Sequence, residues 1–342
     1  MSEASLHASR RQRPSGAAIL SVARKAGLFV LLAAMIVGFW LAEPAFLNVN
    51  NLFSVLQAVA VVAILGVGVT LTLAVDGFDL SIGSIAASAV MGASYAMVVW
   101  QFSAYETIPA VLVMGAMIGL VNGLLIVRVG IPDLLATLSS MFLLAGLQLI
   151  PTGGRSITSG MIMPNGETAP GAYDPAFFPL GRAQLWGVFP LPVVIMAVVA
   201  LVFWFFMERT RWGRVFYAIG GNEMAAHLAG APTSRYRLAA YVLSGTLAAV
   251  GGLIIAARVG RGDVSSGASL LLDSVAAALI GFAVLDARRP NVLGTVVGAI
   301  FVGILLNGLT MLNAPYYTQD FVKGAVLVGA LALTFGLGAK RT

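Results

Sequence analysis

The sequence predicts an all-α membrane protein with about ten transmembrane helices, and three observations lead to that fold class. Apolar residues make up 59% of the 342 residues, and charged residues make up only 10%. The mean hydropathy is +0.94. A soluble domain needs about 25% charged residues to cover its surface, so lipid must solvate much of this chain. The apolar residues also form long runs, and a spanning helix needs roughly 20 of them.

The apolar runs divide the chain into ten predicted spans. A basic tail precedes them, and because many further spans follow, we interpret the first run as a retained helix rather than a cleaved signal. The predicted spans cover residues 26–42, 51–74, 81–100, 108–127, 132–150, 187–207, 237–257, 269–285, 292–312 and 320–338.

The Lys and Arg residues indicate the orientation. With the N-terminus inside, fifteen of the 20 basic residues fall in inner segments and four in outer loops, while Lys323 begins the last span. This is the positive-inside bias of a bacterial inner-membrane protein. It predicts cytoplasmic termini, with a basic N-terminal tail over 1–25, a transmembrane domain over 26–338 and a C-terminal tail over 339–342.

The longest predicted external loop spans residues 151–186. It is rich in glycine and proline, and so has too many turn-forming residues for a span. A partner-docking loop and a disordered connector both fit this composition. The turn-forming residues include Pro151, Gly153, Gly154, Pro164, Gly166, Pro170, Gly171, Pro175 and Pro179.

Small residues repeat within the predicted spans. Gly115, Gly119 and Gly123 recur every four residues, as do Gly294 and Gly298. Such spacing lets helix backbones approach closely, either inside one chain or at a dimer interface.

A weak internal repeat accompanies these glycines. The sequence at residues 84–87 (Ser-Ile-Ala-Ala) is similar to that at 274–277, and Asn122-Gly123-Leu124 recurs at 307–309. The copies lie five spans apart, so they would be inserted in opposite directions, as in inverted-repeat transporters. Chance matches in an Ala/Gly-rich chain are the alternative.

Two carboxylates interrupt the apolar runs at residues 76–84. A carboxylate at mid-bilayer costs about 2.5–3.5 kcal/mol, so Asp76 and Asp79 need a reason to lie there. In a structural interpretation, Gly77 permits a sharp turn, and Asp79 or Ser81 caps the next helix. In a functional interpretation, a broken helix lines a polar path.

Three more polar residues, Asn122, Asp273 and Asn307, lie within predicted spans. Such groups bond to a neighbouring helix or contact a hydroxyl-rich solute in a cavity. Asp273 is the strongest candidate for a pathway residue, because it is ionisable.

Residues 208–236 form the long cytoplasmic loop of this topology. Asn222 is placed to cap a short helix that begins at Glu223, and Gly230 with Pro232 ends it. The helix would present a small, partly apolar face, which suits docking to a soluble partner. A basic loop that only fixes orientation is the alternative. The face consists of Met224, Ala225, Leu228 and Ala229.

The chain offers no catalytic centre of its own. It contains no phosphate-binding loop of the Gly-x-x-x-x-Gly-Lys-Ser/Thr type, no cysteine and only two histidines, His7 and His227. We therefore predict no enzyme activity, no metal site, no cofactor in this chain and no nucleic-acid partner. Any energy for transport would then come from a partner protein or from an ion gradient, as in a secondary transporter that uses Asp76, Asp79 and Asp273. A membrane scaffold without transport activity is a third possibility.

Two motifs and a glycine-containing pair resemble the ribose-type (simple-sugar) ABC transporter permeases. They are residues 76–84 (Asp-Gly-Phe-Asp-Leu-Ser-Ile-Gly-Ser), the loop from Gly213 to Gly230, and Gly294-Thr295 with Asn307-Gly308. The resemblance runs from about residue 45 to 335. The sequence departs from the family at Phe282, at residues 285–290 (Leu-Asp-Ala-Arg-Arg-Pro), and at Leu272, where the family has an acidic residue.

The resemblance implies a ten-helix subunit that pairs with a second permease copy or paralogue in the lipid bilayer. It also implies a cytoplasmic ABC ATPase that binds ATP and Mg, and a periplasmic solute-binding protein. The loop would couple ATPase closure to transport, and the solute would be a sugar or a similar polar molecule. The implied coupling residues are Gly213, Arg214, Tyr217, Ala218, Gly220, Asn222, Glu223, Ala225, Ala226 and Gly230. The pathway candidates are Asp76, Asp79, Ser81, Asn122, Asp273 and Asn307.

Overall fold

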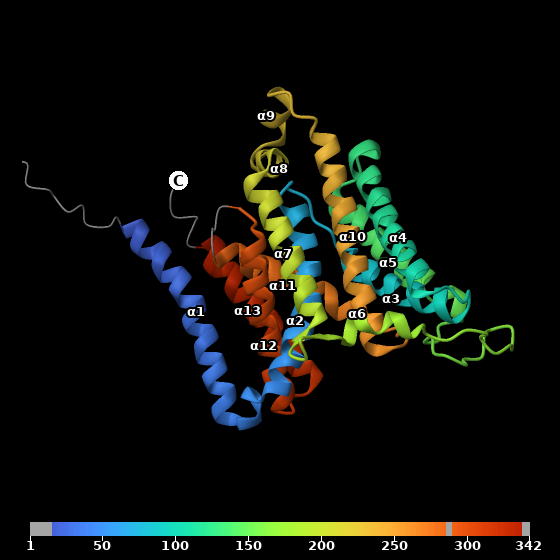
Figure 1. Cartoon of the computed structure of the whole chain (residues 1–342). Helices are drawn as coiled ribbons and strands as arrows, with labels where there is room; N and C mark the ends of the chain where they lie inside the picture. Colours follow the sequence, from blue (N-terminus) through green and yellow to red (C-terminus); the bar gives the residue numbers. More distant parts are fainter. Residues whose placement is uncertain (1–15, 285–288, 337–342) are drawn as a thin grey trace, which may run out of the picture.

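The computed structural model describes residues 16–284 and 289–336, which form a bundle of long helices (Figure 1). Each predicted span falls on one of these helices, and α1 begins ten residues before the predicted start. Residues 1–15, 285–288 and 337–342 lie outside the described residues, and they include the predicted C-terminal tail and the last residues of the predicted spans 269–285 and 320–338. The long helices are α1 (Gly16–Ala42), α2 (Val49–Leu73), α3 (Ile82–Val98), α4 (Ala104–Leu124), α5 (Asp133–Leu147), α7 (Leu191–Arg209), α10 (Thr233–Val259), α11 (Ala268–Val284), α12 (Val292–Met311) and α13 (Tyr316–Gly336).

Six stretches of the described chain are long and apolar enough to cross a membrane. Three further apolar helices are shorter, at Phe29–Ala42, Ile82–Val98 and Ser269–Phe282. The prediction of a polytopic all-α membrane protein is therefore confirmed. The six stretches are Val49–Leu73, Ala104–Val129, Asp133–Thr152, Leu191–Arg209, Thr233–Val259 and Val292–Met311.

Short elements connect the long helices. A π turn (η2, Leu125–Val129) extends α4, and the strands β1 (Gln184–Leu185) and β2 (Phe189–Pro190) form an antiparallel hairpin. The other short elements are η1 (Pro44–Leu47), η3 (Ile150–Thr152), η4 (Pro175–Phe177), α6 (Pro179–Arg182), α8 (Arg211–Gly221) and α9 (Glu223–Leu228).

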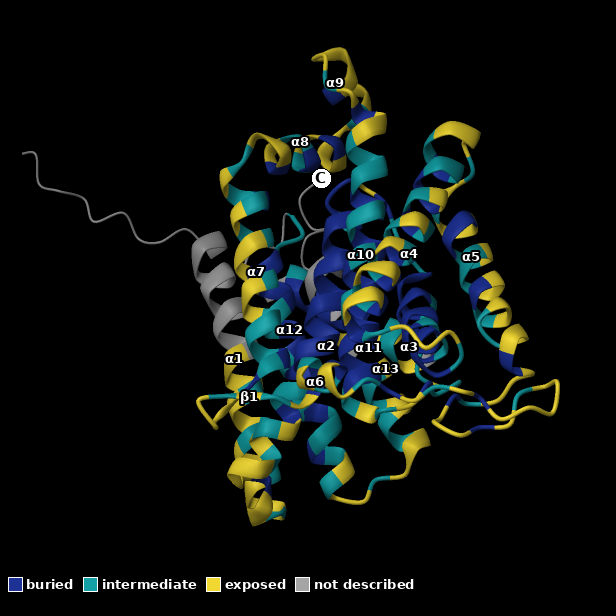
Figure 2. Cartoon of the chain, turned by 45° about the vertical axis from the view of Figure 1, so that its right-hand side comes forward, coloured by how far each residue is buried: buried dark blue, intermediate teal, exposed yellow. Residues whose placement is uncertain are grey.

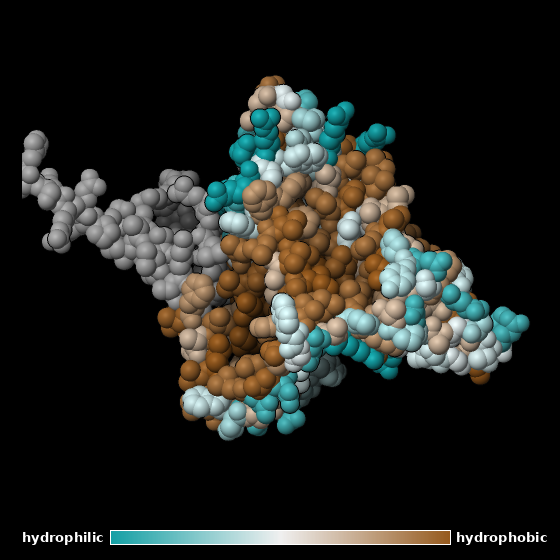
Figure 3. Space-filling view, in the orientation of Figure 1, coloured by the Kyte–Doolittle hydropathy of each residue, from teal (hydrophilic) through white to brown (hydrophobic). Residues whose placement is uncertain are grey.

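The core of the bundle is built around α2 and α10, which bury 67% of their apolar stretches, against 17% for α5. Helix α10 packs along α3 and α4, while α2 packs along α11 and α12. Figure 2 shows these central helices as the buried part of the molecule. The face seen in Figure 3 carries a broad apolar band, with hydrophilic residues gathered over α8 and α9 and on the outlying loop at the other end. Such a band is what lipid solvation requires.

The glycine rows are contact points between helices of the same chain. A methyl added at Gly119 would collide with the backbone of Tyr241 on α10, and one at Gly298 with the backbone of Ala277 on α11. Packing inside the subunit is therefore confirmed. These glycine faces are already occupied, so the alternative of a dimer interface at them is wrong.

The cap segment (residues 150–190) is folded onto the end of the bundle opposite α8. The amide of Gly171 donates to the carbonyl of Val98 at 2.8 Å, and Ile157 exchanges two backbone hydrogen bonds of 2.8 Å with Gly262. The hydroxyl of Tyr173 is hydrogen-bonded to Ser94 on α3, and burial raises the pKa of Tyr173 to about 12. The disordered-connector interpretation is therefore wrong, because the turn-forming residues shape a cover that is tied to the helices.

Candidate functional site: the α8–α9 segment and the α2–α3 turn

The α8–α9 segment (residues 210–232) forms two helices that project from one end of the bundle (Figure 1). The first, α8, was not anticipated from the sequence. The hydroxyl of Thr210 accepts a hydrogen bond from the amide of Gly213 at 3.3 Å. Gly213, Phe216 and Ile219 are buried at a spacing of three, while Arg214 is exposed. A capping Thr before an amphipathic pattern was the signal available in the sequence.

The second helix, α9, confirms the predicted capping. The side-chain oxygen of Asn222 accepts from the amide of Ala225 at 2.9 Å, and Gly230 follows the helix with a φ of +88°. Met224 is 67% exposed and Leu228 is 79% exposed. The apolar face that the sequence predicts is therefore free on the described surface. We call it the docking face: Met224, Ala225, Leu228 and Ala229.

Ala226 does not belong to that face, because it is buried against the protein. Its carbonyl accepts from the amide of Ala231, which closes the turn after α9. A charged side chain there would have to be buried, so its effect could not be assigned to a lost partner alone. The remaining predicted coupling residues lie on α8 (Gly213, Arg214, Tyr217, Ala218 and Gly220), at the junction (Asn222), on α9 (Glu223 and Ala225) and after it (Gly230).

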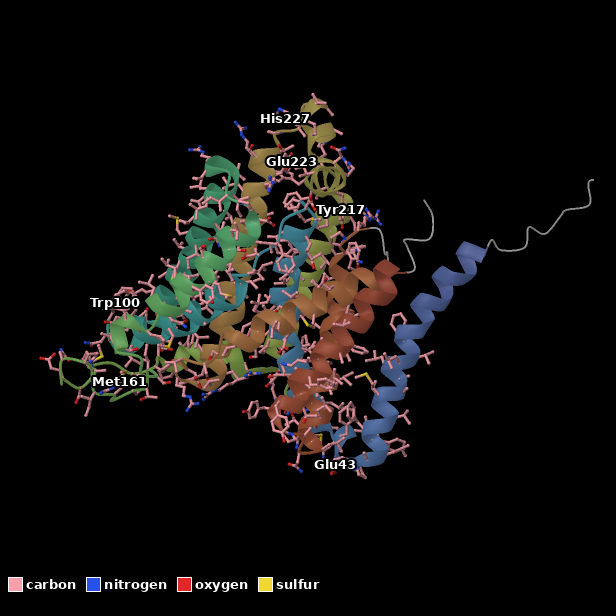
Figure 4. All side chains as sticks on the ribbon, turned by 180° about the vertical axis from the view of Figure 1, so that it is seen from behind. Glu43, Trp100, Met161, Tyr217, Glu223 and His227 are labelled. Atoms are coloured by element: carbon pink, nitrogen blue, oxygen red, sulfur yellow. The ribbon has the colours of Figure 1, made fainter. Side chains whose placement is uncertain are left out.

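Two polar contacts tie the α8–α9 segment to the long helices. Glu223 pairs with Arg237 at the start of α10 at 3.0 Å. Glu208, at the end of α7, accepts from the hydroxyl of Tyr217 at 3.2 Å and from Arg289 at 3.0 Å. The guanidinium of Arg289 also lies 4.6 Å from the centre of the Tyr217 ring. Figure 4 shows Tyr217, Glu223 and His227 together at this end, with Trp100 and Met161 in the lower part of the molecule.

A third contact joins α8 to the α2–α3 turn (residues 74–81). A methyl added at Gly220 would collide with the carbonyl of Ala74 and would lie 3.5 Å from the amide of Asp76. The two predicted motifs, far apart in the sequence, are therefore in backbone contact. A displacement of α8 toward this turn must displace the turn, because packed backbones cannot interpenetrate.

The α2–α3 turn is built by Asp76 rather than by Gly77. The amide of Gly77 donates to Thr72 at 2.9 Å and that of Asp76 to Leu73 at 3.1 Å, which is the Schellman pattern that ends a helix. Asp76 holds the left-handed position with a φ of 56°. Gly77 is needed for space, since an added methyl would lie 2.6 Å from the hydroxyl oxygen of Tyr241.

Asp79 is the buried hub of the turn. One carboxylate oxygen accepts from the amide of Ser81 at 2.9 Å and from its hydroxyl at 2.6 Å, and the other accepts from Ser244 on α10 at 2.8 Å. The hydroxyl of Ser81 therefore donates to Asp79 and makes no cap hydrogen bond to α3. Of the two predicted caps, Ser81 is therefore wrong, because its oxygen accepts from the side chain of Asn122 instead, whereas Asp79 does accept from the amide of Ser81, the residue just before α3.

The network extends from the turn to α4 and α5. The amide nitrogen of Asn122 donates to Ser81 at 2.8 Å, and the Asn122 oxygen accepts from Ser140. The amide of Phe78 donates to Asp133, the first residue of α5, at 2.6 Å. Sequence reasoning missed Ser140 and Ser244, since single serines in apolar helices carry no pattern of their own.

The remaining pathway candidates lie elsewhere. Asp273 on α11 pairs with Lys323 on α13 at 3.2 Å. Asn307 on α12 exchanges two hydrogen bonds of 2.9 Å with Asn51 at the start of α2. Asp76 is exposed beside α8. Asn122, Asp273 and Asn307 thus each bond to another helix, as the structural interpretation predicts. Within the described residues, no group of three His, Asp or Glu side chains could hold a metal ion.

Comparisons with known proteins agree on one family. A family model described as the permease component of the branched-chain amino acid transport system matches residues 51–331. The ribose import permease RbsC of Escherichia coli K12 is 36% identical over 290 residues, which cover 84% of this chain and 87% of the relative. RbsC of Haemophilus influenzae is 32% identical, over 92% of this chain and 94% of the relative.

More distant relatives carry other names. The xylose transport system permease XylH of Haemophilus influenzae is 28% identical, over 89% of this chain and 94% of the relative. No solved structure matches the chain significantly.

Proposed function

This chain belongs to the family of permease components of the branched-chain amino acid transport system, and from that membership we propose that it is the translocation subunit of an ABC importer for a small polar solute. The observation that carries the proposal is the exposed docking face of α9, which continues from α8, the helix whose Gly220 lies against a turn that reaches into the core. The names of the relatives, which include ribose and xylose permeases, favour a monosaccharide or related sugar as the solute.

We propose that the chain spans the bacterial inner membrane ten times, with both termini in the cytoplasm. The long helices that fall on the ten predicted ranges support this topology, as does the polar α8–α9 end. In this orientation the α8–α9 segment is cytoplasmic and the cap segment is periplasmic. The transmembrane domain would then cover residues 26–338, between the tails 1–25 and 339–342.

The docking face would bind a cytoplasmic ABC ATPase that holds ATP and Mg. Met224 and Leu228 provide an apolar contact of small area, and hydrophilic residues gather at the α8–α9 end of the face seen in Figure 3. A short helix in a groove is a common recognition mode. Closure of the ATPase would displace α8 together with α9, because Asn222 joins the two helices without a linker.

Displacement of α8 would act on the long helices at two points. Gly220 would push the α2–α3 turn, whose hub Asp79 is bonded to α10 through Ser244. Tyr217 and Glu208 would pull Arg289, which lies just before α12. The first point acts on helices of the N-terminal half and on α10, and the second acts on the C-terminal half. Alternating access needs such simultaneous action on both halves.

The cap segment supports docking of a periplasmic solute-binding protein, because it is a folded surface at the proposed external end, tied to the helices by backbone hydrogen bonds. A second permease copy or a paralogue would complete the pathway. The intramembrane candidates act in this proposal mainly as ties between helices, since Asp79, Asn122, Asp273 and Asn307 already bond to protein groups. An ion-coupled transporter that works alone is less consistent with relatives named as components of transport systems.

The test is co-purification of the chain with its ATPase and transport by the complex in proteoliposomes. We expect the double variant Met224→Glu/Leu228→Glu to lose the ATPase while it remains inserted. Trp186→Glu is the matched control, because Trp186 is 86% exposed on the hairpin of the cap segment. Retention of the ATPase by the double variant would show that the docking face is misplaced. Uptake by the chain without an ATPase would remove the proposal as a whole.

A further inference from the structure

The α2–α3 turn has a counterpart at the other end of the bundle. The sequence Asp79-Leu80-Ser81-Ile82-Gly83 recurs as Asp263-Val264-Ser265-Ser266-Gly267, an offset of 184 residues. We call residues 260–267 the α10–α11 turn. The offset agrees within one residue with the Asn122–Asn307 match, whereas the match at residues 84 and 274 lies outside this register.

The two turns share their local geometry. Asp79 accepts from the amide and the hydroxyl of Ser81 at 2.9 and 2.6 Å. Asp263 accepts from the amide and the hydroxyl of Ser265 at 2.9 and 2.7 Å. Each turn leads into a helix of 17 residues, α3 or α11. The same local turn geometry therefore occurs in both halves of the described chain.

The turns enter the bundle from opposite ends and meet inside it. The α2–α3 turn starts beside Gly220 of α8, and the α10–α11 turn starts where Gly262 pairs with Ile157 of the cap segment. They meet where Gly83, in the first turn of α3, contacts Gly267. A methyl added at Gly83 would lie 2.7 Å from the carbonyl of Gly267, and one at Gly267 would lie 3.1 Å from that of Gly83.

Around the contact between Gly83 and Gly267, helices of each half pack against helices of the other half. Helix α10 of the second half packs on α3 and α4 of the first, and α2 of the first half packs on α11 and α12 of the second. A movement of either turn would therefore displace helices in both halves. Packed elements with two discrete arrangements transmit such movements better than soft ones.

The two turns differ in how they are held. The second oxygen of Asp79 is bonded to Ser244 on α10, and Asp79 is fully buried. The second oxygen of Asp263 is bonded to Arg261 of its own turn at 2.9 Å. The α2–α3 turn is thus fastened to a central helix, whereas the α10–α11 turn is fastened to the cap segment by the Ile157–Gly262 pair.

We propose that the two turns form one relay through the membrane, in which Gly83 and Gly267 are the pivot and Asp79 and Asp263 are positioning residues. Movement of α8 reaches the cap segment through three backbone contacts: Gly220 with Ala74, Gly83 with Gly267, and Gly262 with Ile157. The relay rests on the proposed function, because it needs the ATPase to move α8. In the reverse direction, a protein that binds the cap segment would signal to the ATPase.

The chain contains no cysteine, so single cysteines can report on each end of the relay. Asp76→Cys reports on the α2–α3 turn and Ser159→Cys on the cap segment, and both positions are exposed. The complex of this chain with its ATPase is labelled with a maleimide, with and without trapping by ADP and vanadate. We expect trapping to change both labelling rates by about threefold or more.

Gly83→Ala should abolish the change at Ser159→Cys and leave the change at Asp76→Cys. Gly92→Ala is the matched control on the same helix, because its added methyl would meet only Met114 at 3.5 Å. If Gly83→Ala does not assemble with the ATPase, Gly267→Ala and the single-cysteine variants without a glycine substitution still test the relay. A change at Asp76→Cys without one at Ser159→Cys in the unaltered background overturns the relay alone. No change at either reporter overturns the proposed coupling and the relay with it.

Discussion

Gly220 of α8 lies against the carbonyl of Ala74 at the end of α2, with no room between them for a methyl group. This contact joins the α8–α9 segment, the proposed binding site of the ATPase, to the turn that contains Asp79. It exists only because residue 220 lacks a side chain. The contact therefore makes the coupling proposal testable with the smallest possible substitution.

We expect Gly220→Ala to reduce transport per ATP hydrolysed by about tenfold, equivalent to about 1.4 kcal/mol of lost coupling. The added methyl would push the α2–α3 turn away from α8. Gly221→Ala is the control, because nothing lies within 4 Å of its added methyl. Uptake and ATPase rates of the reconstituted complex are the measurements. Equal ratios of uptake to ATP hydrolysis in the two variants would show that the contact between Gly220 and Ala74 does not contribute to coupling.

Ser140→Ala should lower the stability of the protein by about 1–3 kcal/mol, because it leaves the buried oxygen of Asn122 without a donor. Ser139→Ala is the neighbouring control. Its hydroxyl is exposed and bonds only to the carbonyl of Leu135 in its own helix. Thermal unfolding in detergent compares the two, and a melting temperature that falls equally in both would argue against the network.

Lys323→Met should strongly reduce the amount of folded protein, since Asp273 would lose its partner inside the apolar band. Breaking such a pair costs about 3–5 kcal/mol. The double variant Asp273→Asn/Lys323→Met removes both charges and should recover most of the yield. Size-exclusion profiles measure this rescue. A double variant as poor as the single one would mean that the residues act separately.

Asn307→Leu alone should destabilise the protein, whereas Asn51→Leu/Asn307→Leu should be closer to neutral, because both members of the amide pair are replaced. Transport by the double variant separates the two interpretations of Asn307. Normal uptake is expected if the residue only ties α12 to α2. A folded double variant without uptake would instead identify Asn307 as a solute contact.

The cap segment should loosen in acid through Asp174. Hydrogen bonds from the amides of Ala104 and Ala176 hold the pKa of this carboxyl below its ordinary value. The unfolded-state pKa of an aspartate is about 3.9. Because the pKa of Asp174 is lower in the folded protein, this carboxylate stabilises the fold at pH values above that of the unfolded state, and the stabilisation is lost as the pH falls through the folded-state pKa.

The rate of pepsin cleavage in the cap segment should therefore rise with acid in the parent protein, and rise less steeply in Asp174→Asn. Glu167→Gln is the control, because its carboxylate accepts from Asn165 in the same loop, whereas Asp174 accepts from the first residue of α4. Identical acid profiles for the parent and Asp174→Asn would count against this role of Asp174.

The sequence was sufficient for the parts of this protein that depend on local chemistry and on solvent. Its long apolar runs require lipid, so the class of fold and the ranges of the helices could be predicted. The capping of α9 by Asn222 and its end at Gly230 were also predictable, because a cap involves residues a few positions apart.

The tertiary structure decided which residues meet. The sequence does not show that Ser244 completes the shell of Asp79, that Lys323 neutralises Asp273, or that Gly83 touches Gly267, since each pair is separated by 50 to 184 residues. The sequence also points to Gly77 for the sharp turn, whereas Asp76 holds the left-handed position and the space beside Tyr241 is what requires a glycine at 77. Contacts between distant segments depend on how helices pack, and an apolar helix in lipid has many faces that would pack equally well until its partners are in place.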